Sequence, residues 1–106
     1  MIIEAEGDLK ELITTGQNRR YKEIVQNAKL FDGLMRAVKI MKSAAGIEEL
    51  KRYSFLHYEQ LKYQYSGLSS VRLSNSFVHR LIFEEMVDGI TLKLIEVNDT
   101  HYGNKK

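Results

Sequence analysis

The sequence predicts an α+β fold, in which two N-terminal antiparallel helices pack on a small twisted antiparallel β-sheet. Three observations lead to this prediction. Apolar residues in the first half of the chain recur at helical spacing, whereas later segments alternate apolar and polar residues. An Asp88-Gly89 pair, typical of a β-hairpin turn, separates two of the alternating segments. The 106 residues are expected to form a single domain spanning 1–106.

The N-terminal half is expected to contain two helices after a short strand at Ile2 and Ile3. Asp8 caps the first predicted helix and Gly16 ends it. The second helix is predicted from about Arg19 to Ala45, with Leu30 and Ile40 off the centre of its apolar face. The centre of that face is predicted to consist of Ile24, Ala28, Phe31, Leu34, Met35, Val38 and Met41.

The C-terminal half predicts a sheet with one face under the helices and the other face free to bind a partner. In one predicted strand, Leu81 and Phe83 face opposite to Arg80, Ile82 and Glu84. The predicted segments are a strand and loop at Ser54–Tyr65, followed by strands at Leu68–Ser74, Phe77–Met86 and Ile90–Val97.

Composition limits the compartment and the class of partner. The chain has no Cys, which excludes disulfides and a thiol nucleophile and fits a reducing compartment. It shows no signal peptide and no membrane-spanning apolar run, so a soluble, cytoplasmic protein that contacts no membrane is expected. The net charge is only +2, but residues 19–42 are strongly basic, a pattern compatible with RNA or an acidic partner.

Most common catalytic motifs are missing from the sequence. No glycine-rich phosphate loop is present, and the three His residues lack metal-ligand spacing. Asp99 and His101 would share one face of a strand, but no third ligand is apparent, so neither a metal nor another cofactor is expected. His79 precedes Arg80 and is expected to point to the opposite face, which leaves it outside the candidate site.

A metal-free RNA-cleaving site fits the remaining polar residues. The 2′-hydroxyl of RNA can attack the adjacent phosphorus if a base, an acid and a fixed cation are present. Arg suits phosphate binding and His suits proton transfer near neutral pH. The plainer interpretation is that these are exposed strand residues paired with neighbouring charges. The candidates are His57, Lys62, Arg72, Arg80, Asp99 and His101.

The order of these residues resembles the RelE/ParE toxin superfamily, especially its HigB (plasmid maintenance killer) branch. The resemblance rests on L-H-Y-E-Q-L-K-Y-Q-Y-S-G-L-S-S-V-R (Leu56 to Arg72) and H-R-L-I-F (His79 to Phe83). The D-G turn and E-V-N-D-T-H (Glu96 to His101) complete it. The family fold, two N-terminal helices against a small antiparallel sheet, is the fold that the sequence pattern predicts independently.

The resemblance implies the toxin of a type II toxin–antitoxin system, a ribosome-dependent mRNA endoribonuclease that acts in the ribosomal A site without metal. Arg80 and Lys62 would bind the scissile phosphate, with Arg72 and Tyr102 supporting substrate binding. Orientation and proton transfer would be shared by His57, Asp99 and His101. A HigA-like helix-turn-helix antitoxin would neutralise the toxin, and operator DNA would be bound only through the toxin–antitoxin complex.

The sequence departs from the family pattern in three places, and other functions stay open. One departure is the loop S-N-S-F-V-H before Arg80, which is about two residues longer than usual. L-H-Y-E-Q-L-K is two residues longer than L-H-x-L-K, and Thr100 stands where a Tyr is common. The alternatives are a ParE-like toxin that inhibits DNA gyrase by binding and a catalytically degenerate toxin that only binds its antitoxin. Outside the family, a generic basic module that binds RNA or protein is the remaining alternative.

Overall fold

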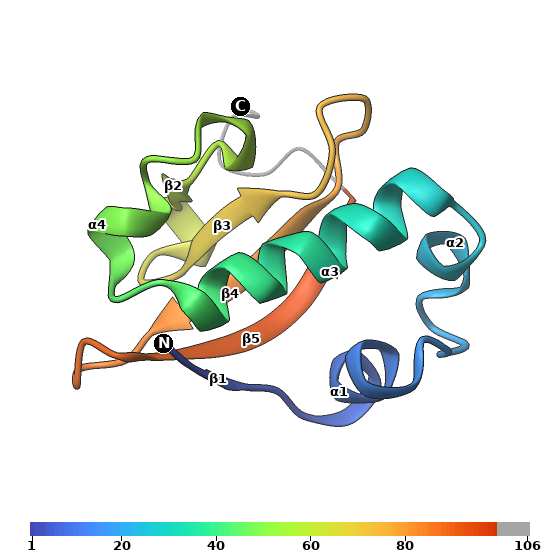
Figure 1. The fold of residues 1–106 in the computed structure, drawn as a ribbon, viewed down its shortest axis with the longest axis horizontal. Helices are drawn as coiled ribbons and strands as arrows, with labels where there is room; N and C mark the ends of the chain where they lie inside the picture. Colours follow the sequence, from blue (N-terminus) through green and yellow to red (C-terminus); the bar gives the residue numbers. More distant parts are fainter. Residues whose placement is uncertain (100–106) are drawn as a thin grey trace.

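The computed structural model describes residues 1–99, which form a helical layer on one face of a five-stranded sheet (Figure 1). The strand order across the sheet is β1-β5-β4-β3-β2. The strands are β1 (Ile2–Glu4), β2 (Glu59–Gln60), β3 (Ser69–Arg72), β4 (Arg80–Glu85) and β5 (Thr91–Asn98). The α-helices are α1 (Gly7–Thr15), α2 (Lys22–Val25), α3 (Ala28–Ser43) and α4 (Ile47–Leu50), with 3₁₀ turns η1 (Ser54–Leu56) and η2 (Tyr63–Tyr65). The predicted α+β class is confirmed.

The sheet is mixed, so the prediction of a purely antiparallel sheet was wrong. Strands β2 to β5 pair antiparallel, but β1 runs parallel to β5, with Ile2 opposite Thr91. The Ile2 backbone N–H donates to the Ile90 carbonyl at 2.7 Å. The apolar pair at the start of the chain correctly predicts a strand. The pair does not reveal whether this strand runs parallel or antiparallel to its neighbour, because the neighbour, β5, lies at the other end of the sequence.

The long predicted helix is interrupted, which corrects its predicted start at Arg19. The Asn27 side chain accepts hydrogen bonds from the backbone N–H groups of Lys29 and Leu30, at 3.1 and 3.2 Å. This N-cap begins α3 and separates it from the short α2. In Figure 1, α1 is seen nearly end-on whereas α3 lies across the view, so antiparallel pairing of the two helices is not confirmed.

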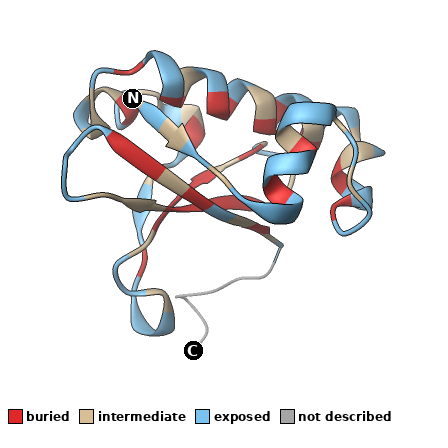
Figure 2. Ribbon diagram, turned by 90° about the horizontal axis from the view of Figure 1, so that it is seen from below, coloured by how far each residue is buried: buried red, intermediate tan, exposed pale blue. Residues whose placement is uncertain are grey.

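The core lies between α3 and the covered face of the sheet. Figure 2 shows buried residues on the strands and on the side of α3 that faces them. On the sheet, Leu81 and Phe83 belong to this core, as their alternation predicts. The buried residues of α3 are Leu30, Gly33, Leu34, Ala37, Val38 and Met41. The predicted stripe was therefore shifted, since Leu30 lies at its centre and Ala28 is exposed.

Gly33 allows the closest approach between α3 and the sheet. A Cβ at this position would lie 1.9 Å from the Leu73 carbonyl oxygen at the end of β3. No side chain fits in that distance, so the helix can pack this tightly only with glycine here. The contact sets the position of α3 relative to β3.

The predicted hairpin between β4 and β5 is confirmed. Gly89 has a positive φ of 76°, and the Asp88 carboxylate accepts hydrogen bonds from both N–H groups that follow the turn. The Thr91 hydroxyl also donates to Asp88, at 2.6 Å. These bonds, that of the Thr91 hydroxyl first, lower the pKa of Asp88 because they stabilise its charged form.

Several strands are shorter than the sequence predicts. The Ser54–Tyr65 segment contains only the two-residue strand β2 between the turns η1 and η2. The segments predicted as strands at Leu68–Ser74 and Phe77–Met86 contract to β3 and β4. Within residues 1–99, no helix has both the length and the apolar character needed to cross a membrane.

Candidate functional site

Arg80 is the centre of a polar cluster on the sheet face opposite α3, called the open face below. Part of this face is covered, because Leu61, Tyr65 and Leu68 pack around Ile82. It begins β4 and lies directly opposite Arg72 on β3 and Asn98 on β5. Because side chains alternate along a strand, Arg80 points away from the face that carries Leu81. Its relative exposure is only 8%, which is unusual for a permanently charged side chain.

Ser70, His57 and Glu59 all contact the Arg80 guanidinium. Its Nε donates to the Ser70 hydroxyl at 2.7 Å, and a terminal nitrogen donates to the backbone carbonyl of His57. The Glu59 carboxylate forms an ion pair with it at 3.6 Å. The cation is thus oriented by contacts from β2, β3 and η1 before any ligand arrives.

Arg72 adds a second positive charge that the protein does not fully satisfy. Its Nε is buried and has no hydrogen-bond partner. Two like charges opposite each other on neighbouring strands destabilise a sheet. A phosphate bound between Arg72 and Arg80 would offset that repulsion.

Glu59 is a candidate that the sequence analysis missed. Its side chain is 58% exposed, so the carboxylate is open to solvent beside the Arg80 cation. It lies two residues after His57 within the quoted L-H-Y-E-Q-L-K run. The run therefore contains Glu59, but the resemblance implies roles for His57 and Lys62 only.

His57 and Lys62 are not aligned on Arg80 as the resemblance implies. His57 ends η1 with a positive φ of 48°, and its Nε2 lies 3.1 Å from the Asn75 side-chain oxygen. Its carbonyl, rather than its imidazole, contacts Arg80. Lys62 is exposed just before η2.

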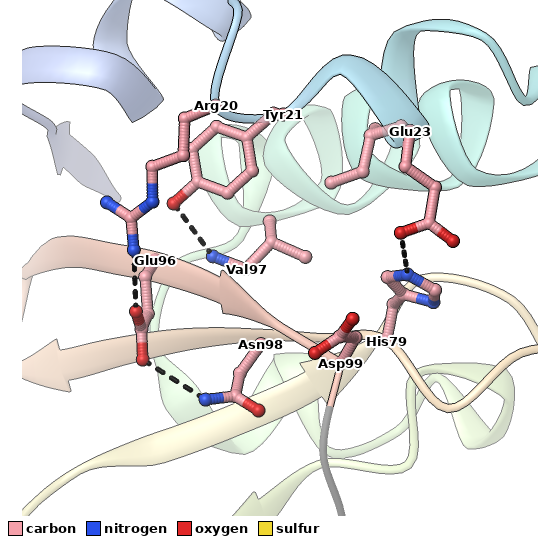
Figure 3. Close-up of a pocket in the computed structure, with 9 residues that line it drawn as sticks. Arg20, Tyr21, Glu23, His79, Glu96, Val97, Asn98 and Asp99 are labelled. Carbon is pink, nitrogen blue, oxygen red and sulfur yellow. Dashed lines mark hydrogen bonds and ion pairs between the residues drawn. The ribbon is translucent and has the colours of Figure 1, made fainter.

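Asp99 lies on the other side of the sheet from Arg80. Figure 3 shows it at a pocket that β5 and the segment before β4 share with α2. Its carboxylate lies within 4.8 Å of ligand atoms of Glu23 and His79. His79, which the sequence analysis set aside, therefore faces opposite to Arg80 as expected but lines a pocket of its own. Lining this pocket are Arg20, Tyr21, Glu23, Ile24, His79, Glu96, Val97, Asn98 and Asp99.

The far wall of this pocket is held together by side chains along the edge of β5. Arg20 forms an ion pair with Glu96 at 3.1 Å, and the Tyr21 hydroxyl accepts the Val97 backbone N–H at 3.3 Å. Burial raises the pKa of Tyr21, so the phenol stays neutral at physiological pH. These contacts connect Arg20 and Tyr21, directly before α2, to β5 along one side of the pocket.

Three positions of the sequence analysis, Thr100, His101 and Tyr102, lie outside the described residues. The structure thus brings together Arg80, Arg72 and Glu59 on the open face. It places Asp99 apart from them, with His79 and Glu23.

The comparisons with known proteins support the fold. The chain matches no family model and no curated protein. Among solved structures, it is similar to a YoeB/ParE toxin from Agrobacterium tumefaciens, with a TM-score of 0.53 and 16% sequence identity. The match covers 95% of this chain and 100% of that chain. At this identity the likeness concerns the fold alone and does not single out the HigB branch, so the chain shares the fold of that protein.

Proposed function

We propose that this protein is the toxin of a type II toxin–antitoxin system and cleaves mRNA on the ribosome without a metal ion. The observation that carries the proposal is the pair of opposed arginines on the open face, Arg80 and Arg72, with the Glu59 carboxylate beside them. The likeness to a YoeB/ParE toxin supports the toxin assignment.

The cluster supplies the charges that RNA cleavage needs. Arg80 is oriented before substrate arrives, so it stabilises the developing negative charge on the phosphorane without further reorganisation. Within residues 1–99, the buried Nε of Arg72 has no hydrogen-bond partner, so the protein satisfies the Arg72 charge only in part. Together the two guanidinium groups match the non-bridging oxygens of one phosphate.

The chemical step transfers one proton in and one proton out. The Glu59 carboxylate takes the proton of the 2′-hydroxyl, and the O2′–P bond forms as the P–O5′ bond breaks. The leaving 5′-oxygen takes a proton from an acid, for which His101 is the candidate from the sequence. The products are a 2′,3′-cyclic phosphate and a 5′-hydroxyl. His57 and Lys62 remain candidates for binding the message beside this centre.

The finer assignments follow from the resemblance. They are the HigB branch, action in the ribosomal A site, a HigA-like helix-turn-helix antitoxin, and operator binding only through the toxin–antitoxin complex. We expect the antitoxin to cover basic surface, because exposed cations lie along α3 at Lys29, Arg36, Lys39 and Lys42.

A second candidate is a ParE-like toxin that binds DNA gyrase and cleaves nothing. One observation favours it. The His57 ring contacts Asn75, and the His79 ring lies with Glu23 and Asp99 on the other side of the sheet, so neither is directed at the proposed phosphate position. The degenerate toxin, which only binds its antitoxin, shares this feature.

The test is to induce the protein from a tightly controlled promoter and to map mRNA 5′ ends. We expect codon-phased cuts with 5′-hydroxyl ends in translated messages. Glu59→Gln, an isosteric change at an exposed position, should abolish the cuts, whereas Glu6→Gln at the exposed start of α1 should not.

The other outcomes separate the candidates. Growth arrest with intact mRNA would favour gyrase inhibition. No arrest and no cuts would leave the degenerate toxin or a generic basic module. Cuts that persist in Glu59→Gln would remove this carboxylate from the proposed mechanism.

A further inference from the structure

The pocket between α2 and the ends of β4 and β5 holds three metal-ligating side chains that RNA cleavage does not use. Glu23 comes from α2, His79 precedes β4 and Asp99 follows β5 (Figure 3). Their ligand atoms all lie within 4.8 Å of one another. We propose that Glu23, His79 and Asp99 bind one divalent first-row transition-metal ion, of which Zn²⁺ is the representative.

The sheet register brings two of these ligands together. Arg80 and Asn98 are paired across β4 and β5, and their side chains point to the open face. His79 and Asp99 are the next residues outward on each strand, so both point to the opposite face. Their proximity is therefore a consequence of backbone pairing and does not depend on flexible side chains alone.

The spacing of the ligand atoms fits a metal ion. Zn²⁺ binds nitrogen and oxygen ligands at about 2.0–2.2 Å in a tetrahedral arrangement, so its ligand atoms lie about 3.4 Å apart. The Nε2 of His79 already lies 3.4 Å from Oε1 of Glu23. Asp99 is exposed, so rotation of its carboxylate can bring its oxygen from within 4.8 Å of the other ligand atoms toward this spacing.

The burial of His79 is a second observation that points to a ligand. Its relative exposure is 6%, and its Nδ1 is buried without a hydrogen-bond partner. Protein contacts therefore satisfy only one of its ring nitrogens, which makes burial of the ring costly. Coordination of a metal ion by Nε2 would replace the long 3.4 Å contact with Glu23 by a metal–ligand bond to this buried ring, while Nδ1 would keep its lack of a partner.

The donor set selects the kind of metal. One imidazole and two carboxylates suit Zn²⁺ or Mn²⁺, whereas Mg²⁺ and Ca²⁺ prefer oxygen ligands alone. Three protein ligands leave a fourth position for water. The ion would tie α2 to the ends of two strands, on the side of the sheet away from Arg80 and Glu59.

The test is calorimetric titration of the tag-free, chelator-treated protein with Zn²⁺, with Mg²⁺ as the comparison. We expect one Zn²⁺ per chain, weaker Mg²⁺ binding and a higher melting temperature with Zn²⁺. Glu23→Gln and Asp99→Asn should each weaken Zn²⁺ binding by at least about tenfold. Both positions are exposed, so these isosteric changes should leave the fold intact.

The matched control is Glu6→Gln. Glu6 is an exposed glutamate directly before α1, so its substitution should leave Zn²⁺ binding unchanged. The proposal would be overturned if the wild-type protein did not bind Zn²⁺. It would also be overturned if Glu23→Gln and Asp99→Asn bound Zn²⁺ within about twofold of the wild-type affinity. Because Glu23 is not part of the open-face cluster, Glu23→Gln should still cleave mRNA. Failure of the metal proposal and failure of the proposed nuclease are therefore distinguishable.

Discussion

The two faces of the sheet are built from the same strands but differ in how their buried side chains affect stability. On the covered face, Leu81 and Phe83 are fully buried against α3 and lie in one continuous apolar core. On the open face, Arg80 is nearly as buried but sits opposite Arg72, which has an unsatisfied Nε. The first arrangement stabilises the fold, whereas the second costs free energy in the absence of a ligand.

The difference is the reason for proposing the open face as the binding face. A surface that served only stability would not bury one arginine directly opposite another. Residues kept at a cost to stability are a common mark of a functional site. The predictions below test this contrast, beginning with the change of largest expected effect.

Truncation on the covered face should be the most damaging change. Phe83 is 0% exposed, so Phe83→Ala removes a full ring from a packed core and leaves a cavity. We expect the free energy of unfolding to fall by about 3–5 kcal/mol. Urea unfolding followed by circular dichroism measures this. A loss below about 1 kcal/mol would contradict the assigned core.

Adding one methyl group where α3 meets the sheet should also destabilise. Gly33→Ala places a Cβ 1.9 Å from the Leu73 carbonyl oxygen, so helix or strand must move. We expect a loss of about 1–3 kcal/mol, although Ala normally favours a helix. Gly46→Ala is the control, since a Cβ there meets nothing within 4 Å. Equal stability of the two variants would show that the close approach is wrong.

Removing a charge from the open face should raise the free energy of unfolding, in contrast to the two preceding changes. Arg72→Met keeps most of the side-chain volume and removes a charge that opposes Arg80. We expect a gain in stability of up to about 1 kcal/mol, measured by urea unfolding. The variant should also lose the stabilisation that added phosphate gives to wild type. Lys39→Met, an exposed cation on α3, should retain the phosphate effect.

The smallest effect concerns the hairpin turn, and it is present at neutral pH and lost in acid. The pKa of Asp88 is lowered in the folded protein from its ordinary value of 3.8. Its contribution to stability is therefore present above 3.8 and is lost as the pH falls from there through the lower folded pKa. Thermal melts should show Asp88→Asn less stable than wild type at neutral pH and equal to it in strong acid. Asp32→Asn, on the exposed side of α3, should show no such convergence.

Local patterns predicted those parts of the fold that depend on neighbouring residues. The alternation of Leu81 and Phe83 with Arg80 gave the correct faces of β4, and Asp88-Gly89 gave the correct turn. The pattern was less informative where one polar side chain decided the outcome. Asn27 caps α3 and ends the continuous helix, although the apolar spacing runs through it.

The sites depend on contacts between distant segments, which the sequence does not show directly. Arg80 and Arg72 were predicted, because strand alternation places both on one face. Glu59 was missed because its partner Arg80 lies on a different strand. Glu23 was missed as a neighbour of His79 for the same reason, since 56 positions separate them.

The position of β5 has a consequence for the order in which the protein can fold. β5 lies between β1 and β4, although β1 is the first strand in the chain and β5 the last of the described strands. A nascent chain that has left the ribosome only as far as β4 therefore cannot yet pair β1. Closing Ile2 against Thr91 also joins the ends of a very long loop, which slows folding. Asn98 on β5 can therefore pair with Arg80 only after residues 91–98 have been synthesised.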